Sequence, residues 1–447
     1  MHFGRRNGLL NLALFSAVWA SLIGLSAADL KGVFAHYMVG SMTQQEAVTD
    51  VTDAKGLGID AFALNVQSTA DWATSAVQYL FDAARDAGFK LFFSFDMYSF
   101  KDPSEFLPLL TKYANHTAYY KHDNKPFVST FKGGASTYTF GQNSTNAGWS
   151  VAFRQAAARG GVNPFFVPNF DDASGYPAGF FDSFPVVDGV FGWETAWPAE
   201  SAGVANVSDT VDHAVLDAAR AANKVYMMPL SSLQFKDLGG QNWYRIGELN
   251  YAQRIEQVLE LQPDFVEIVT WNDAGESHYI GNFWPEQIAG TDIGNYTNGF
   301  DHKGWQQLLP PFIQAYKSGN TDVTKLYPPS GKSAAGAMWY RPVLTTSDCP
   351  QKPSGWQSAQ DAVNYAVLLP EGSDGFKINV YSNNEQIGSF PAGAGMNARL
   401  VLGLQAGPQR LEVVDGSGTV VASANGTKEV QTSADLCNYN YVVVGLS

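Results

Sequence analysis

The chain has 447 residues, of which 45% are hydrophobic, so it can form a large core and disorder is excluded as its main state. Charged residues make up only 16% and aromatic residues reach 13%, a balance that favours neutral, flat ligands. The formal net charge of −14 would repel a phosphate backbone, so we expect no nucleic-acid partner.

The first residues predict a secretory signal peptide over residues 1–28. Arg5 and Arg6 precede the apolar run Leu9–Leu25, and small residues at 26–28 offer a cleavage site. The run is long enough to leave a membrane anchor as the alternative, whereas the rest of the sequence has no comparable apolar stretch. We therefore expect a secreted, extracellular or cell-wall protein that makes no membrane contact after cleavage.

Two further features agree with export. Five Asn-X-Ser/Thr tripeptides in polar stretches are candidate glycosylation sites, at Asn115, Asn143, Asn206, Asn295 and Asn425. The only two cysteines are Cys349 and Cys437, and in an oxidising compartment one disulfide between them is the simplest interpretation. Two cysteines without nearby histidines argue against a metal site.

Between residues 29 and 325 short apolar runs alternate with helical patterns. The apolar runs predict β-strands that are buried on both faces, as in parallel sheets. They are Val33–Val39, Ile59–Val66, Lys90–Asp96, Pro126–Phe131, Asn163–Phe170, Val187–Glu194, Lys224–Ser231 and Asp264–Asp273.

Helical patterns lie between most of these runs, and the stretch Ser174–Pro185 is the weakest of them. The clearest are Thr74–Gly88, Asp102–Leu110, Asp209–Asn223, Tyr251–Gln262 and Lys303–Gly319. This alternation predicts an α/β fold, a (β/α)8 TIM barrel, with a doubly wound open sheet as the alternative.

The chain changes character after residue 325. Residues 326–340 are rich in Pro, Gly, Ser and Ala and predict a linker or domain junction. Over residues 341–447, period-two segments such as Phe376–Asn383 and Leu411–Gly416 alternate with turn residues, which predicts an antiparallel β-sandwich. We expect a docked structural domain, with an independent sugar-binding module as the alternative.

In a barrel of this kind the functional side chains lie at the C-terminal ends of the strands. Carboxylates and aromatic residues gather at those positions. Glycosidic bond cleavage requires such a set, because one acid protonates the leaving oxygen while the other activates water or attacks the sugar. The candidate substrate-binding residues are His36, Asn65, Tyr98, Asp171, Asp172, Trp193, Glu194, Trp197, Trp271, Asn272, His278 and Tyr279.

Three acids are the candidate catalytic residues. Asp273 and Glu276 follow the last predicted strand three positions apart, with Gly275 between them, so both can point into one cavity. A solvated turn is the alternative for this segment. Asp96 ends a very apolar run and is expected at the rim of the site or buried, with helix capping as its alternative.

Other assignments stay open at this point. Asp171 and Asp172 are equally suited to stabilising a turn, and His36 to being a satisfied barrel histidine. Asp212 and His213 are interpreted as part of a solvated helix face. No zinc-hydrolase motif, phosphate-binding loop, dinucleotide fingerprint or serine elbow occurs in the sequence, so we expect no metal and no cofactor.

Four segments of the chain resemble glycoside hydrolase family 71, the fungal α-1,3-glucanases or mutanases. They are Lys31–Gly40 (KGVFAHYMVG), Phe92–Met97 (FFSFDM), Pro168–Asp172 (PNFDD) and, the most specific, Trp271–Gly281 (WNDAGESHYIG). The resemblance runs from about Leu30 to the C-terminus and includes the β-rich tail.

The resemblance implies an inverting, endo-acting hydrolase of α-1,3-glucan, with Asp273 and Glu276 as the acid/base pair and Asp96 as a further essential carboxylate. Within this implied mechanism Glu276 is the preferred general acid and Asp273 the preferred base. A glycosidase of different glucan specificity and a non-catalytic wall-binding glycoprotein are the alternatives. We expect the protein to act on the polysaccharide as a monomer.

Overall fold

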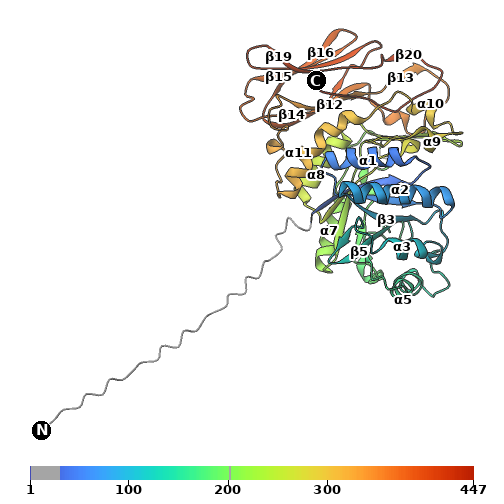
Figure 1. The fold of residues 1–447 in the computed structure, drawn as a ribbon. Coiled ribbons are helices and arrows are strands. Elements are labelled where there is room, and N and C mark those ends of the chain that lie inside the picture. The colour runs from blue at the N-terminus through green and yellow to red at the C-terminus, as the bar shows by residue number, and fades with distance from the viewer. Residues whose placement is uncertain (2–30, 201–202) are drawn as a thin grey trace.

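The computed structural model describes Met1, residues 31–200 and residues 203–447, so the predicted signal peptide lies outside the described residues except for Met1. An N-terminal α/β domain and a C-terminal β domain pack directly against each other (Figure 1). Within the described residues, no helix combines the length and the apolar character that crossing a membrane requires.

A curled sheet forms the centre of the N-terminal domain. Eight strands pair in parallel in the order β6-β5-β3-β2-β1-β11-β8-β7. They are β1 (Gly32–Met38), β2 (Ala61–Val66), β3 (Lys90–Asp96), β5 (Lys125–Phe131), β6 (Phe165–Phe166), β7 (Gly189–Phe191), β8 (Val225–Leu230) and β11 (Phe265–Ile268). The short β4 (Lys121–His122) is antiparallel to β5.

The two ends of this strand order, β6 and β7, also touch. Asp188 donates its backbone N–H to the carbonyl of Phe166 at 2.8 Å, and Phe191 donates to the carbonyl of Pro168 at 2.9 Å. The sheet is therefore curled far enough for its ends to meet, although these two bonds are fewer than a full strand ladder provides.

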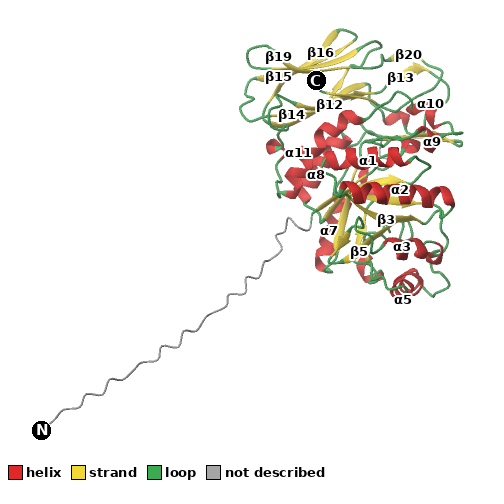
Figure 2. Cartoon of the chain, viewed as in Figure 1, coloured by secondary structure: helices red, strands yellow, loops and turns green. Residues whose placement is uncertain are grey.

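The helices of this domain are α1 (Gln44–Gly56), α2 (Asp71–Ala87), α3 (Leu107–Tyr113), α4 (Thr145–Gly148), α5 (Ala156–Arg159), α6 (Phe180–Ser183), α7 (Thr210–Ala221), α8 (Asn250–Leu261), α9 (Pro285–Ile288), α10 (Ile293–Thr297) and α11 (Leu309–Lys317). The long helices such as α1 and α2 lie along the outside of the sheet, whereas α9 and α10 lie beside the C-terminal domain (Figure 2). The α1 helix starts at a capping box, in which Thr43 and Glu46 satisfy each other's backbone N–H groups.

Phenylalanines fill the inside of the curled sheet. The rings of Phe34, Phe92, Phe127 and Phe265, from β1, β3, β5 and β11, have centroids between 4.7 and 5.7 Å apart where they meet. All four are fully buried, and burial of each stabilises the fold by about 1.5–3 kcal/mol. Much of the aromatic content of the chain therefore belongs to the core, and not to ligand binding.

The C-terminal domain has two four-stranded antiparallel sheets, β17-β14-β12-β21 and β16-β15-β18-β19, and a separate β13-β20 pair. The strands are β12 (Ala335–Tyr340), β13 (Val343–Asp348), β14 (Ala362–Leu369), β15 (Phe376–Ser382), β16 (Glu385–Ala392), β17 (Gly395–Leu402), β18 (Gln409–Val414), β19 (Val420–Asn425), β20 (Gln431–Ser433) and β21 (Val442–Gly445). Val363 and Val367 of one sheet share an apolar core with Val380 and Leu411 of the other. The predicted disulfide between Cys349 and Cys437 is confirmed.

Two predictions need correction. The predicted junction, 326–340, is too long, because Ala335–Tyr340 forms the fully buried strand β12 between β14 and β21. Asp212 is also fully buried and does not lie on a solvated face. Its carboxylate bonds the guanidinium of Arg254 on α8 at 2.8 Å, and this counter-charge is what permits a buried acid on α7.

Candidate active site

A cleft of about 870 Å³ opens at the C-terminal ends of the parallel strands. Many of the sequence-predicted positions meet there, although they come from different strands. The predicted residues that line it are His36, Asn65, Asp96, Tyr98, Trp193, Glu194, Asn272, Asp273 and Glu276.

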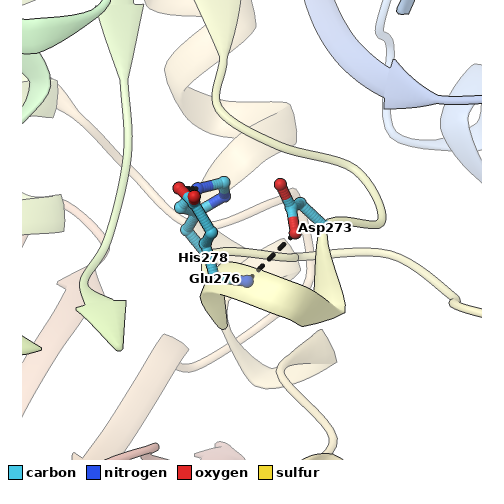
Figure 3. Close-up of side chains that lie close together, drawn as sticks. All are labelled: Asp273, Glu276 and His278. Carbon is cyan, nitrogen blue, oxygen red and sulfur yellow. Dashed lines mark hydrogen bonds and ion pairs between the residues drawn. The ribbon is translucent and has the colours of Figure 1, made fainter. Parts of the chain in front are cut away.

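The loop after β11 presents two acids to this cleft. Asp273 precedes a single 3-10 turn, Ala274–Glu276, and its Oδ1 accepts the backbone N–H of Glu276 at 3.0 Å (Figure 3). One carboxylate oxygen of each acid and a ring nitrogen of His278 lie within 4.8 Å of one another. The loop thus holds two carboxylates and an imidazole in one cluster (Figure 3).

Three neighbours surround the Glu276 carboxylate. Gln234 donates to its Oε2 at 2.8 Å, His278 Nε2 lies 3.2 Å from the same oxygen, and Lys236 Nζ lies 3.5 Å from Oε1. Burial opposes the charged form, but the hydrogen bond and charge of His278, followed by Lys236 and Gln234, outweigh it and lower the pKa of Glu276 to about 2. Glu276 is therefore the ionised member of the pair.

Asp273 has the opposite environment. Burial raises its pKa, and the negative charge of Glu276 adds to this effect, while His278 and Lys236 oppose it. Its backbone N–H donates to Thr270 Oγ1 at 2.9 Å, which fixes the start of the turn. Two acids on one loop are therefore driven towards different protonation states, as an acid/base pair requires.

Asp96 closes the strand β3 at the floor of the cleft and is only 6% exposed. Its Oδ1 accepts the backbone N–H groups of Tyr98 at 2.8 Å and Ser99 at 3.3 Å, and Asn65 Nδ2 approaches Oδ2 at 3.5 Å. Burial raises the pKa of Asp96, and these hydrogen bonds oppose the rise. The residue both stabilises a turn and faces the cleft.

His36 meets a buried acid that sequence reasoning missed. This acid is Glu267, a fully buried residue of β11. Its Oε1 lies 2.6 Å from Nδ1 of His36. The other ring nitrogen, Nε2, is buried and has no hydrogen-bond partner among the described residues, although His36 lines the cleft. The edge-to-face ring of Trp193, 4.9 Å away, fixes the imidazole further. Glu267 escaped notice because it interrupts a continuous apolar run, FVEIV.

The acids Asp171 and Asp172 lie behind the cleft lining and hold loops. Asp171 Oδ2 accepts the backbone N–H groups of Trp193 at 3.0 Å and Glu194 at 2.9 Å. Asp172 accepts three consecutive N–H groups, those of residues 133–135, with the closest at 2.8 Å. Both carboxylates therefore stabilise turns, which is the alternative that the sequence left open for them.

Four further predicted residues, Trp197, Trp271, His278 and Tyr279, are also absent from the cleft lining. Trp271 is fully buried and donates through Nε1 to Asp50 at 3.1 Å. Tyr279 is 1% exposed and stacks on His302 with ring centroids 4.1 Å apart. The expectation of direct sugar contact is corrected for these residues, because each is at most 3% exposed and none lines the cleft.

A β-hairpin between β8 and α8 was not predicted from the sequence. Its strands, β9 (Gln234–Leu238) and β10 (Gln241–Arg245), form one wall of the cleft. Gly239 and Gly240 have φ values of 62° and 80°, which a two-residue I′ turn requires. The Gly-Gly pair between two mixed polar–apolar runs was the signal that could have revealed it.

Exposed aromatic side chains extend the cleft beyond the acids. Tyr98 and Trp72 are 66% and 44% exposed and line it, as does Trp243 of β10. Such faces suit stacking against sugar rings. Trp72 and Trp243 were not predicted, because neither follows a strand of the parallel sheet.

The comparison with known families agrees with this site. The family model described as "Glycosyl hydrolase family 71" matches residues 29–447. A glucan endo-1,3-α-glucosidase of Schizosaccharomyces pombe is 32% identical over 442 residues, covering 96% of this chain and 98% of that protein.

Two other relatives have similar names. An ascus wall endo-1,3-α-glucanase of Schizosaccharomyces pombe is 28% identical over 446 residues, covering 94% of this chain and 99% of that protein. A mutanase of Penicillium rubens is 30% identical over 434 residues, covering 94% and 89% of the two chains. The matches extend through both domains, and the resemblance of the four sequence segments is confirmed. The chain belongs to glycoside hydrolase family 71.

Proposed function

We propose that the protein is a secreted, endo-acting hydrolase of α-1,3-glucan that works at the cell wall or outside the cell. The observation that carries this proposal is the Asp273–Glu276 loop at the cleft, in a chain whose relatives are named as endo-1,3-α-glucanases and a mutanase. The five candidate glycosylation asparagines are all exposed, which suits an exported glycoprotein.

The architecture proposed with it is a (β/α)8 TIM barrel over residues 29–325, followed by a β-sandwich. Eight parallel strands in a sequential order and the two hydrogen bonds between β6 and β7 support the barrel. The shared core of two antiparallel sheets supports the sandwich.

In this proposal Asp273 is the general acid and Glu276 the general base, the reverse of the preference stated from sequence. The raised pKa of Asp273 keeps its proton available for the leaving glycosidic oxygen. The lowered pKa of Glu276, about 2, keeps it anionic and able to take a proton from water. Asp96, His36 and Asn65 at the floor of the cleft are proposed to bind the sugar beside the cleaved bond.

Inversion of the anomeric carbon is the proposed stereochemistry. An inverting pair needs its carboxyl groups ~6.5–9.5 Å apart to hold a water, whereas a retaining pair lies at ~5–5.5 Å. One oxygen of Asp273 and one of Glu276 lie within 4.8 Å of each other, and both residues line the open cleft, where a water would have to fit between the two carboxyl groups. NMR of the first product anomer tests this: an initial β-anomer supports inversion, and an initial α-anomer contradicts it.

The variants Glu276→Gln and Asp273→Asn test the catalytic roles. Each keeps the shape of the side chain and removes its proton transfer, so we expect at least a ~100-fold loss of reducing ends released from α-1,3-glucan. Glu256→Gln, at an exposed position on α8 outside the cleft, is the matched control and should keep full activity. Full activity of a folded Glu276→Gln variant would refute the assignment.

The substrate is tested with a panel of insoluble and soluble α- and β-glucans. We expect reducing ends from α-1,3-linked polymers and short oligosaccharides of several lengths among the early products. Faster release from another linkage would replace the proposed substrate while leaving the glycosidase assignment intact. Binding to glucan with no release by the wild-type protein would favour the non-catalytic alternative.

A further inference from the structure

The C-terminal domain reaches the active site through the β9–β10 hairpin. A segment of that domain runs beside β10, where Tyr244 donates its backbone N–H to the carbonyl of Ser354 at 2.8 Å and Ser354 donates to Asn242 at 2.9 Å. Asn242 Nδ2 also donates to the carbonyl of Gln351 at 2.9 Å. Ser354 therefore forms a parallel β-bridge with Trp243, and residues 351–355 lie against the hairpin.

A second segment of the same domain holds the hairpin from another side. The hydroxyl groups of Tyr244 and Tyr441 are 2.8 Å apart and buried. The ring of Tyr439 lies 5.3 Å from that of Tyr244 and 6.3 Å from that of Phe235 on β9. Both strands of the hairpin therefore contact residues 439–441.

The disulfide joins these two segments. Cys349 lies directly before residues 351–355, and Cys437 lies directly before residues 439–441. The disulfide thus connects the two segments of the C-terminal domain that contact the hairpin. It is the one covalent link between them besides the main chain.

The inner face of the hairpin contacts Glu276. Gln234 and Lys236 of β9 supply two of its polar neighbours, at 2.8 and 3.5 Å. Arg245 of β10 fixes Gln234 in turn, because its Nη1 donates to Gln234 Oε1 at 3.3 Å while its guanidinium also bonds the carbonyl of Pro198. A displacement of the hairpin would therefore change the surroundings of Glu276.

We propose that the disulfide-linked segments of the C-terminal domain, residues 349–355 and 437–441, are a positioning element for the catalytic base. They hold the hairpin so that Gln234 and Lys236 stay against Glu276. This inference rests on the proposed function, in which Glu276 is the base. The C-terminal domain is then a part of the catalytic apparatus, and not a separable sugar-binding module.

The measurable consequence is the acid limb of the pH profile. The groups that face Glu276 are Lys236 from the hairpin, His278 and Asp273 from its own loop, and Tyr296 from α10, whose hydroxyl bonds Gly275. Loosening the hairpin weakens the effect of the Lys236 charge and of the hydrogen bond from Gln234 on Glu276, and leaves the groups on the loop and on α10 in place. The pKa of Glu276 then rises, so activity is lost at a higher pH as the medium is acidified.

Two glycines of the C-terminal domain provide a matched pair of variants. Gly355 has φ 85°, and a Cβ at this residue would lie 2.3 Å from the carbonyl oxygen of Tyr244. Gly418 has nearly the same φ, 88°, with nothing within 4 Å of an added Cβ. Gly355→Ala and Gly418→Ala therefore bring similar backbone strain to one domain, but only Gly355→Ala pushes on the hairpin.

We expect Gly355→Ala to raise the pH at which kcat/KM falls on acidification by about one pH unit. Gly418→Ala should leave this pH unchanged. The double variant Cys349→Ser/Cys437→Ser should move it in the same direction. In a Lys236→Met background, Gly355→Ala should add a smaller shift, because only the hydrogen bond from Gln234 is then left for it to weaken.

An unchanged acid limb in folded Gly355→Ala or in the folded cysteine double variant would overturn the proposal, and so would an equal shift in Gly418→Ala. If Gly355→Ala does not fold, the proposal is tested by the pH profile of the cysteine double variant and by that of wild-type enzyme reduced with dithiothreitol. A fully active Glu276→Gln variant would instead refute the proposed function, so the two failures are distinguishable.

Discussion

Asp273 and Glu276 differ in protonation because of their neighbours and not because of residue type. In free peptides the pKa of aspartate lies below that of glutamate, yet here burial raises the pKa of Asp273 and the neighbours of Glu276 lower its pKa to about 2. His278, on the same loop, contributes most to lowering the pKa of Glu276, and Lys236 and Gln234 add to this effect from about forty residues away in sequence. The sequence of the loop alone therefore could not indicate the acid and base roles that we propose.

At the same scale, Glu267 is expected to act through His36. Its carboxylate accepts from the Nδ1–H group, so Nε2, which has no partner among the described residues, is left to accept from a sugar hydroxyl at the cleft. Glu267→Ala releases the ring, and the loss of one hydrogen bond to a charged group corresponds to roughly a tenfold rise in KM.

Glu267→Gln can still accept from Nδ1 and should give a smaller rise in KM, which a purely structural role of Glu267 would not produce. The measurement is KM against kcat on soluble α-1,3-linked oligosaccharides. An unchanged KM in folded Glu267→Ala would contradict the role given to this pair.

At the scale of elements, one buried carboxylate anchors the loop that carries Asp273 and Glu276 to α1. Asp50 is fully buried and accepts from Tyr37 Oη at 2.7 Å and from Trp271 Nε1 at 3.1 Å. It also accepts from Asn282 Nδ2 and Trp284 Nε1, each at 2.9 Å. The two ends of the loop that carries Asp273 and Glu276 thus converge on a single acid.

We expect Asp50→Asn to lower the free energy of unfolding by about 3 kcal/mol, because an amide cannot accept these four donors and turns its own N–H groups towards them. Denaturant unfolding measures the change. Asp53→Asn on the same helix is the control, since Asp53 is partly exposed and accepts only from Asn282 at 3.0 Å. Equal losses in both variants would contradict the anchoring role.

Elements with strong local patterns could be predicted from sequence. The β3 strand was predicted with the bounds it has, Lys90–Asp96, because it is a continuous apolar run bounded by polar residues. The predicted strand Asn163–Phe170 shrinks to the two residues of β6, which is flanked by Pro164 and Pro168, residues with no N–H group to donate to a strand ladder. The α1 helix was missed, since its sequence, QQEAVTDVTDAKG, has a weak apolar face.

The site was predictable where it follows the parallel strands and unpredictable where tertiary packing decides. His36, Asp96 and Asp273 line the cleft as the strand-end rule predicts. Trp271 and Tyr279 belong to the same motif but are turned into the core, where Asp50 and His302 partner them. Local sequence does not specify on which side of a loop a side chain lies.

At the scale of the whole molecule, the two domains share an extensive polar and aromatic interface. Trp339 Nε1 of β12 donates to the carbonyl of Glu248 at 2.7 Å, and Gln307 donates to the carbonyl of Leu446 at 2.9 Å. His302, fully buried, contacts the carbonyls of Tyr279 and Tyr441 through its two ring nitrogens. The α/β domain therefore depends on the β domain for partners of buried groups.

We expect deletion of residues 341–447 to abolish cooperative folding of the remaining chain. The truncation exposes Trp305 and Trp339, whose rings pack at 5.8 Å in the interface, and leaves the groups around them without partners. Thermal unfolding followed by near-UV circular dichroism is the measurement. A truncated chain that unfolds at the wild-type temperature would show instead that the C-terminal domain is independent.

The bond between His36 and Glu267 joins residues that are 231 positions apart in the sequence. The strand β1 has β2 on one side and β11 on the other, so its second neighbour is synthesised only after most of the α/β domain. Such non-local pairing slows folding and leaves an apolar strand edge exposed in the meantime. A chain interrupted before residue 267 consequently cannot assemble the cleft floor, because both the second neighbour of β1 and the partner of His36 are missing from it.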